Sequence, residues 1–279
     1  MLRLALVGTG DAGKHHAHAL GRLAKEKLIS FTAIAARDAA RVDAFRKEQD
    51  VAPEVTTFAS YEALLDARVC DAVILATPDG MHAAQIEQAI ARGLHVLAEK
   101  PFVATLAEGS RVVERARASG VHVAAGYHLR HHAAHRVAVE RVSALVGTVR
   151  NVTVRWAWPD PAKDGWRARG DGARFWSLAA LGTHGIDLAL LFTGGHPPTK
   201  VACVREPASG IDRAAEVVMR FESGAVAHVS SAVTHRAISR VAVTGDLGEI
   251  ELLGTLGARG DGSLAFRGPR DTTTTPIAF

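Results

Sequence analysis

The sequence has few cysteines, few aromatic residues and no block of one charge. Its 279 residues include two cysteines, Cys70 and Cys203, and aromatic side chains make up 5%. Two cysteines provide no disulfide framework and lack the spacing of a zinc site, so we expect reduced thiols in a cytoplasmic protein. The net charge is only +4, and the lysines and arginines are scattered, which argues against a nucleic-acid partner.

The sequence also lacks a long apolar run. The stretch SLAALGTHGIDL (177–188) is interrupted by His184 and Asp187, and the N-terminus lacks the pattern of a signal peptide. No membrane partner is therefore expected. Hydrophobic residues make up 48% of the chain, which is enough for a large buried core, and the charged fraction of 22% does not indicate disorder.

The first 127 residues alternate apolar strands with amphipathic helices. Asp38 and Ser60 are predicted to cap two helices, and Thr105 with Glu108 forms a capping box at a third. Strand patterns occupy 2–8, 30–36, 56–59, 71–77, 95–100 and 122–127. The alternation predicts an α/β domain over 1–127 with a doubly wound parallel sheet.

The pattern changes in residues 128–279. A helix is expected over 131–147 and another over 177–188, and the remainder is rich in strand patterns. The turns ESG (222–224) and GDLG (245–248) predict hairpins, so we expect an α+β domain with an open, mainly antiparallel sheet. The polar tail GPRDTTTTPIAF (268–279) is expected to be loose.

The motif LVGTGDAG places three glycines between a strand and a helix. Gly8 is predicted to make the tight turn, Gly10 to let the backbone approach a pyrophosphate, and Gly13 to let the helix pack close to the strand. The helix N-terminus adds unpaired N–H groups for the phosphates. The whole loop, including Thr9, Asp11 and Ala12, is expected to bind a dinucleotide.

The end of the second strand bears on which dinucleotide binds. NAD would favour an acidic residue there for the ribose, but this strand ends in Ala36 and Arg37, and Asp38 suits a helix cap better. Arg37 and Arg41 could instead pair with a 2′-phosphate, because arginine binds phosphate bidentately. We therefore expect NADP(H) rather than NAD(H), although both arginines could simply be solvated.

Other polar residues follow two further strands of the predicted sheet. Glu99 and Lys100 end the strand in HVLAEKPF, at the edge where open α/β sheets bind ligands, and both are expected to contact the cofactor. Lys100 could donate a hydrogen bond to a substrate oxygen near the nicotinamide; the alternative is a solvated lysine. Thr77 and Pro78 end another strand, and with His82 they are expected to shape the cofactor site.

Several motifs together resemble the Gfo/Idh/MocA family of NAD(P)-dependent oxidoreductases: LVGTGDAGKHH, TPDGMH, GLHVLAEKPF, GYHLR, GWR and LGTHGID. The resemblance implies a Rossmann domain joined to a mainly antiparallel sheet that often forms dimers or tetramers. In this family the active site combines the lysine of E-K-P with D-x-G-x-H, and here Lys100, Gly182 and His184 match. It also places Tyr127, Arg130, Trp166 and Arg167 at the substrate pocket, and the bulky Trp176 is expected to reshape that pocket.

The resemblance assigns chemistry to these residues. His184 would act as general acid or base at the carbon that exchanges hydride, and Lys100 would bind the reacting oxygen. Gly182 and Gly185 are expected to let the helix approach the cofactor. The family also continues beyond the point where this sequence ends, so the second domain, 128–279, is shorter than is typical.

One family position differs, because Ala180 stands where the active-site aspartate is expected. Three explanations remain open: another acid compensates, with Asp160, Asp164 and Asp171 as candidates; the substrate is an activated ketone or an imine; or catalysis has been lost. We therefore expect an NADP(H)-dependent oxidoreductase acting on a sugar-derived or other small carbonyl compound. The alternative is a dinucleotide-binding regulatory or structural protein.

Histidines cluster after the Rossmann strands, at positions 128, 131, 132 and 135. His131 and His135 are four residues apart and could share a metal ion on a helix, but no cysteine or carboxylate accompanies them. We expect no metal site there, and instead a helix start that lies at the pocket edge or is solvated.

Overall fold

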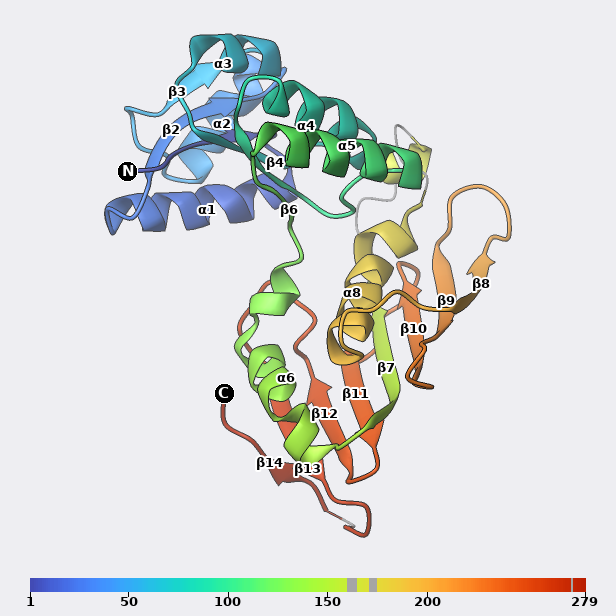
Figure 1. The fold of residues 1–279 in the computed structure, drawn as a ribbon. Coiled ribbons are helices and arrows are strands. Elements are labelled where there is room, and N and C mark those ends of the chain that lie inside the picture. The colour runs from blue at the N-terminus through green and yellow to red at the C-terminus, as the bar shows by residue number, and fades with distance from the viewer. Residues whose placement is uncertain (160–164, 171–174, 272) are drawn as a thin grey trace. The chain divides into compact units, whose positions relative to one another are not determined.

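The computed structural model describes residues 1–159, 165–170, 175–271 and 273–279. The chain divides into two compact units, Met1–Gly126 and Tyr127–Phe279 (Figure 1). Each unit contains one sheet and its own hydrophobic core.

The first unit contains a six-stranded sheet in the order β3-β2-β1-β4-β5-β6, with every pair parallel. This order is the one found in dinucleotide-binding Rossmann folds. The predicted doubly wound parallel sheet is therefore confirmed. The strands are β1 (Arg3–Val7), β2 (Ser30–Ala35), β3 (Thr56–Phe58), β4 (Ala72–Leu75), β5 (His95–Ala98) and β6 (Val123–Ala125).

Helices connect these strands, and three of them have the side-chain caps that the sequence predicts. Asp38 accepts a hydrogen bond from the Arg41 N–H at 3.2 Å, and Thr105 and Glu108 form a complete capping box. Ser60 accepts from the Ala63 N–H at 3.0 Å. The helices are α1 (Asp11–Lys25), α2 (Ala39–Glu48), α3 (Tyr61–Ala67), the short 3₁₀ turn η1 (Asp79–Met81), α4 (His82–Ile90) and α5 (Leu106–Ser119).

Both faces of this sheet are buried, as expected for a parallel sheet with crossover helices. On one face Leu20 and Phe45 of α1 and α2 pack with Ile34 of β2. On the other face α3, α4 and α5 contribute Leu64, Ile86 and Val112. The carboxyl ends of the strands are left for the loops that carry the predicted cofactor residues.

The second unit contains an eight-stranded sheet in the order β14-β13-β12-β11-β7-β10-β9-β8. The predicted hairpins are present, since β9 pairs antiparallel with β10 and β11 with β12. Among the described strands of this second sheet, β7 and β10 form the one parallel pair. The strands are β7 (Val149–Ala157), β8 (Lys200–Glu206), β9 (Ala214–Arg220), β10 (Val226–Ala232), β11 (Arg240–Gly245), β12 (Glu249–Leu253), β13 (Ser263–Arg267) and β14 (Thr275–Pro276).

The expectation of a loose C-terminal tail is wrong for its last part. Thr275 and Pro276 form β14 against β13, and the Ile277 N–H donates to the Leu264 carbonyl at 2.8 Å. Ile277 also packs against the hydrophobic core. The strand pairing of Thr275 and Pro276 and the packing of Ile277 thus order a segment whose polar composition suggested a loop.

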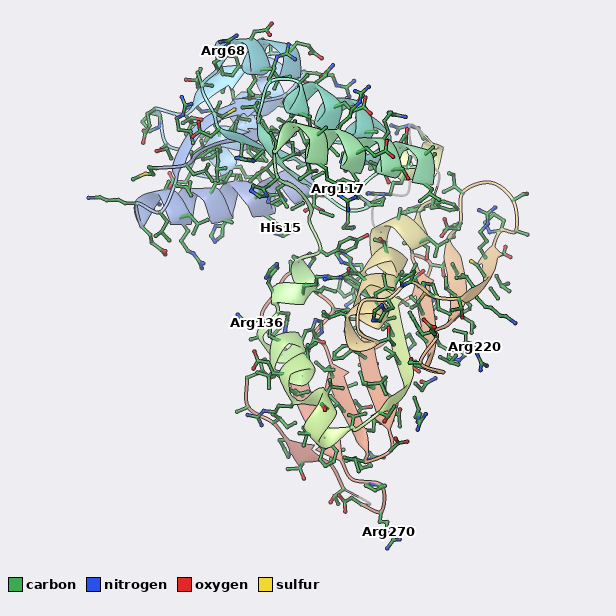
Figure 2. The ribbon with its side chains drawn as sticks, viewed as in Figure 1. His15, Arg68, Arg117, Arg136, Arg220 and Arg270 are labelled. Carbon is green, nitrogen blue, oxygen red and sulfur yellow. The ribbon has the colours of Figure 1, made fainter. Side chains whose placement is uncertain are left out.

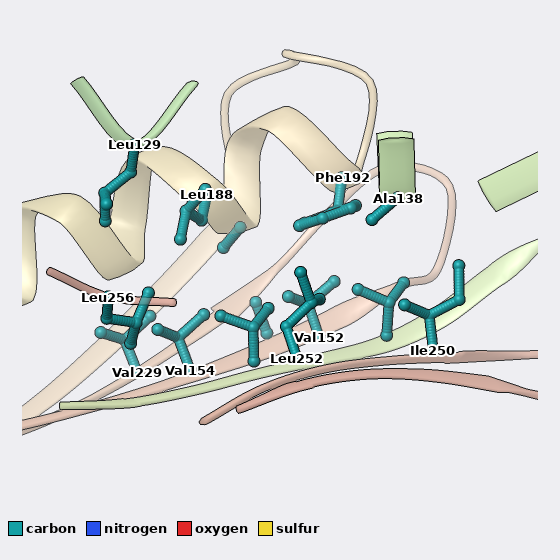
Figure 3. Packing of buried hydrophobic residues seen from close by; sticks show 14 of the residues in the cluster. Leu129, Ala138, Val152, Val154, Leu188, Phe192, Val229, Ile250, Leu252 and Leu256 are labelled. Carbon is teal, nitrogen blue, oxygen red and sulfur yellow. The ribbon is translucent and has the colours of Figure 1, made fainter. Parts of the chain in front are cut away.

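Two helices, α6 (Ala133–Leu145) and α8 (Thr183–Phe192), cover one face of this sheet (Figure 1). Leu188 and Phe192 of α8 pack on valines and leucines of the strands (Figure 3). Shorter helical segments are the 3₁₀ turn η2 (His128–His131), α7 (Trp166–Arg169) and the π-helical stretch η3 (Leu178–Gly182), which leads directly into α8. Within the described residues, the helices are too short or too polar to cross a membrane.

The structure gives Gly182 and Gly185 a different role from the one expected. A Cβ on Gly185 would lie 2.6 Å from Cγ1 of Val229, and a Cβ on Gly182 would lie 2.9 Å from Oγ of Ser231. Both glycines therefore face strand β10 of their own unit. They let the helix lie close to the sheet, so the prediction that they serve the approach to the cofactor is wrong.

Arginine side chains project from separate places on both units. Arg68 and Arg117 lie on the first unit, and Arg136, Arg220 and Arg270 lie on the second (Figure 2). Their spread matches the scattered basic residues of the sequence.

Candidate active site

The three glycines of the first loop differ in their surroundings. Gly8 has a φ of +105°, and a Cβ there would overlap the Ala76 carbonyl oxygen. A Cβ on Gly13 would overlap the Gly8 carbonyl oxygen, because α1 starts so close to the loop. At Gly10 a Cβ would meet nothing within 4 Å. The fold itself therefore requires Gly8 and Gly13, whereas the space at Gly10 is free for a ligand.

The first turn of α1 is suited to phosphate oxygens. Gly10 is the N-cap and has no side chain to satisfy the backbone N–H groups of the first turn. Thr9 and Ala12 are partly buried and Asp11 is exposed, so the loop backbone lies at the surface. These residues fit the pyrophosphate of a dinucleotide.

Arg37 and Arg41 follow the partly buried Ala36 at the carboxyl end of β2, and both side chains are exposed. Asp38 is engaged as the cap of α2. The Asp38 carboxylate, the nearby group that could bind a ribose hydroxyl, is therefore engaged in capping α2.

His82 joins the two loops that follow β4 and β5. Its ring nitrogens lie 2.9 Å from the Thr77 carbonyl oxygen and 3.0 Å from that of Pro101. Thr77 also donates its hydroxyl to Gln85 at 2.5 Å. Because His82 is 1% exposed, it holds the loops next to Pro78 and Lys100 in place.

Glu99 is held by residues of its own unit. One carboxylate oxygen lies 2.9 Å from Nε2 of His16 on α1, and the other accepts the backbone N–H of Lys100 at 3.1 Å. Burial raises the pKa of Glu99, but the hydrogen bond and charge of His16, followed by Lys100, outweigh burial and hold the pKa below its ordinary value. Glu99, predicted to touch cofactor, thus fixes the backbone of Lys100.

This pairing predicts a pH-dependent contribution of Glu99 to stability. A carboxylate whose folded pKa is lowered stabilises the fold above its ordinary pKa and loses that effect as the pH falls through the folded pKa. We expect Glu99→Gln to lower the urea midpoint at pH 7 and to match wild type in acid. Glu48→Gln, at an exposed carboxylate facing Lys14, controls for the lost charge. A difference that grows on acidification would contradict the assigned sign.

In the second unit His184 lies on α8 and is 2% exposed. Three rings surround it: that of His128 with centroids 4.9 Å apart, that of Trp156 at 5.6 Å and that of Tyr127 at 6.0 Å. His184 therefore lies in an aromatic cage built by β7 and by the segment that opens the unit.

The opening segment 127–130 also holds α8 by polar contacts on both sides of His184. The Tyr127 hydroxyl is 2.8 Å from the hydroxyl of Thr183, and Arg130 binds Asp187 through Nε and Nη2 at 2.7–3.0 Å. The hydrogen bond to Asp187 raises the pKa of Arg130, and burial raises the pKa of Tyr127. Arg130, predicted to contact substrate, therefore has its guanidinium on a nearly buried carboxylate.

Asp212 was missed by sequence reasoning. Its side chain is buried and accepts the backbone N–H groups of Trp176 and Leu178, each at 2.8 Å. It lies in the loop between β8 and β9 and caps the helical segment that leads to His184. No local sequence signal marks it, because the helix it caps begins more than thirty residues earlier in the chain.

The remaining predicted residues belong to the second unit. Trp176 is 6% exposed, and the guanidinium of Arg213 lies 6.0 Å from its ring centroid. Arg167 stacks on the ring of Trp166 at 4.1 Å. Ala180 is partly buried within η3, and the candidate substitutes for its missing carboxylate, Asp160, Asp164 and Asp171, lie outside the described residues.

Two of the four histidines after β6, His132 and His135, have structural roles. His135 is buried between the Leu129 carbonyl at 2.8 Å and the Thr255 hydroxyl at 2.9 Å, and burial lowers its pKa to about 4. His132 caps α6 through the Ala134 N–H. These bonds engage the rings of His132 and His135 within their own unit.

Two family models match the chain, one for each unit. The model described as "Oxidoreductase family, NAD-binding Rossmann fold" matches residues 2–127, and "GFO/IDH/MocA C-terminal domain" matches residues 136–251.

The chain belongs to the Gfo/Idh/MocA oxidoreductase family.

Several Gfo/Idh/MocA proteins show how far the likeness extends. D-xylose 1-dehydrogenase (NADP(+)) 2 of Haloferax volcanii is 34% identical over 71% of this chain. A dTDP-3,4-didehydro-2,6-dideoxy-alpha-D-glucose 3-reductase of Saccharopolyspora spinosa is 31% identical over 78%. The chain spans 60% and 65% of the lengths of these relatives. The aldose-aldose oxidoreductase structure from Caulobacter crescentus has a TM-score of 0.86 at 22% identity, covering 99% of this chain and 83% of that one, which shows a shared fold.

Proposed function

We propose that this Gfo/Idh/MocA chain is an NADP(H)-dependent oxidoreductase that moves hydride to or from a sugar-derived carbonyl or hydroxyl group. The observation that carries the proposal is that both members of the lysine–histidine pair are retained and held firmly. Lys100 follows β5 with its backbone fixed by Glu99, and His184 stands in a ring of aromatic side chains on α8.

The proposed mechanism divides the work between the two residues. The bound nicotinamide supplies or accepts the hydride. Lys100 donates a hydrogen bond to the reacting oxygen and stabilises its developing negative charge. His184 gives a proton to that oxygen during reduction and removes it during oxidation. We further propose that Tyr127, Trp166, Arg167 and Trp176 line the substrate side, with Arg130 acting through Asp187.

NADP(H) is the proposed cofactor because two exposed arginines follow β2 and the nearby aspartate is used as a helix cap. The relative from Haloferax volcanii carries NADP(+) in its name. The residues of the glycine loop, which follows β1, and Thr77, which follows β4, would also bind the dinucleotide.

The arginine assignment predicts a selective loss of affinity. Replacing Arg37 and Arg41 together with Met should raise the KM for NADP(H) by roughly 10²–10⁴-fold, because each of the two charged hydrogen bonds to a phosphate is worth roughly 1.5–3 kcal/mol and every 1.4 kcal/mol is tenfold. The KM for NAD(H) should change little, and Lys47→Gln, an exposed residue of the same helix, should leave both unchanged. Equal losses for both cofactors would contradict a 2′-phosphate contact.

Assembly and location are part of the proposal. The face of the second sheet opposite α6 and α8 is proposed to form a dimer or tetramer, as the family resemblance implies. The exposed free thiol of Cys203 suits a reducing, cytoplasmic setting. Sedimentation velocity of the purified chain checks the oligomer.

The test is an absorbance assay at 340 nm with both cofactors. The panel contains D-xylose, myo-inositol, 1,5-anhydro-D-fructose, a simple ketone and a cyclic imine. The ketone and the imine are included because Ala180 replaces the aspartate of the family pattern, and reduction of such compounds does not need that carboxylate. Carbonyl compounds are assayed with NADPH and NADH, and alcohols with NADP⁺ and NAD⁺. Turnover of a sugar by wild type that prefers the phosphorylated cofactor, and that is absent in Lys100→Met, supports the proposal. A flat panel with NADPH still bound favours a non-catalytic dinucleotide-binding protein. Failure of the folded chain to bind either nucleotide overturns the proposal.

A further inference from the structure

His184 is buried, yet the role proposed for it requires a proton in every turnover. Its ring is 2% exposed and lies among the rings of Tyr127, His128 and Trp156. An acid that protonates substrate must recover its proton from water before the next cycle. A ring this deeply covered needs a neighbour that exchanges protons with water on its behalf.

The groups around His184 differ in their ability to do so. Tyr127 is bonded to the hydroxyl of Thr183 and has a raised pKa, so its phenol keeps its proton near neutral pH. Asp187, one turn along α8, is bound by Arg130 through two nitrogens. Trp156, from β7, does not titrate.

His128 has the properties that the other groups lack. Its ring meets that of His184 edge to face, with centroids 4.9 Å apart and an interplanar angle of 77°. The side chain is exposed. Imidazole gains and loses protons near neutral pH more readily than any other side chain.

We propose that His128 relays protons between His184 and bulk water. The inference rests on the proposed function, and His128 acts through His184, so it is a positioning residue rather than a catalytic one. The family pattern that identified Lys100 and His184 assigns no such task to His128. The GYHLR segment would thus both hold α8 and connect its histidine to solvent.

The proton and electron balance is simple. During reduction a hydride from the cofactor forms the C–H bond, the carbonyl π pair moves to oxygen, and oxygen takes a proton from the His184 imidazolium. Neutral His184 then takes a proton from the His128 imidazolium, which regains one from water or a buffer acid. A rotation of the exposed ring or one bridging water completes the transfer. Oxidation of the alcohol runs the same transfers in reverse.

The test compares His128→Gln with His131→Gln. His131 is an exposed histidine of the same 3₁₀ turn and serves as the matched control. With the panel sugar that wild type turns over, His128→Gln should lower kcat about 10-fold, less than loss of the acid itself at roughly 10²–10⁴-fold. KM should change less than twofold. Added imidazole should restore most of kcat in His128→Gln and have no effect on His131→Gln.

A second measurement needs no substrate. In the folded chain with ¹³C-labelled histidines, removing the neighbouring imidazolium should raise the titration midpoint of His184 in His128→Gln and leave it unchanged in His131→Gln. A midpoint and a kcat that are both unaltered overturn the relay. A uniform loss of kcat and KM without imidazole rescue also overturns it, because that pattern indicates a structural role.

The outcomes separate the relay from the proposed function. Full activity in His184→Gln would remove the proposed catalytic pair whatever His128 does. If wild type turns over no panel compound, the proposed function fails on its own assay, and the titration of His184 decides whether the two histidines are coupled. Coupling in that case supports the relay geometry, and its absence overturns it.

Discussion

Lys100→Met and His184→Gln are each expected to lower kcat by about 10²–10⁴-fold, with the double variant no worse than roughly the poorer single one. The reason is that both side chains are proposed to act on one oxygen in one transition state. Lys100 stabilises the negative charge that His184 then neutralises with a proton, so the loss of either removes most of the benefit of the other. Initial rates at saturating cofactor measure the effect.

Two surface substitutions control for this cycle. Lys200→Met and His196→Gln change the same residue types at exposed positions and should leave kcat within twofold. Cofactor affinity, measured by NADPH fluorescence, should persist in all four variants. Multiplicative losses in the double variant would show that the residues act in separate steps, which would contradict a shared site.

Gly185→Leu is expected to lower the free energy of unfolding by about 3 kcal/mol, at the upper end of overpacking effects in well-packed cores. A Cβ alone would lie 2.6 Å from Val229 and 3.2 Å from Val154, and both valines belong to strands under α8. The helix would have to move away from the sheet. Urea denaturation followed by tryptophan fluorescence reports on this unit, because the protein's four tryptophans lie in it.

The matched control is Gly21→Leu in α1. A Cβ there meets nothing within 4 Å, so leucine should be neutral or stabilising by up to about 1 kcal/mol through helix propensity. Urea denaturation followed by circular dichroism at a helical wavelength, which also detects the first unit, measures this variant. Val229→Ala in the Gly185→Leu background should restore part of the lost stability. An unchanged urea midpoint for Gly185→Leu would refute the close packing described for this helix.

The elements that sequence reasoning predicted well are those determined by local patterns. The strand and helix alternation of the first unit follows from hydrophobic periodicity, and the caps at Asp38, Ser60 and Thr105 follow from residue types at fixed offsets. Gly8 and Gly13 of the glycine loop were predictable as single residues, because backbone conformation at Gly8 and close approach at both positions exclude other side chains.

The site residues that were missed depend on contacts between distant segments. Asp212, in the loop between β8 and β9, caps a helical segment that starts 36 residues earlier in the chain. His16 of α1 bonds to Glu99, which is 83 residues later. Neither partner is visible within a sequence window. The π-helical stretch before α8 adds a second difficulty, since a π turn holds more residues than an α turn and shifts the faces counted from sequence.

Sequence reasoning also misjudged the two glycines near His184. Glycine within a helix indicates that some backbone must approach closely, but the approaching partner was taken to be a ligand. The structure identifies it as β10, through Val229 and Ser231. Arg130 was predicted to contact substrate because its motif position matched, and that assignment stays a prediction. The structure adds a partner that the sequence did not indicate, since its guanidinium binds Asp187.

The position of β7 has a consequence for folding order. β7 is a central strand of its sheet, and both of its neighbours, β10 and β11, are synthesised later in the chain. The centre of the second sheet therefore forms only when β7 pairs with strands far along the chain, and contacts of such long sequence separation slow folding. The first unit has all six of its strands by Ala125 and can fold while the ribosome is still making the rest. A nascent chain arrested far enough past Ala125 for the whole first unit to leave the ribosome should already resist proteolysis over that unit. The second unit should gain protection only after β10 and β11 have emerged.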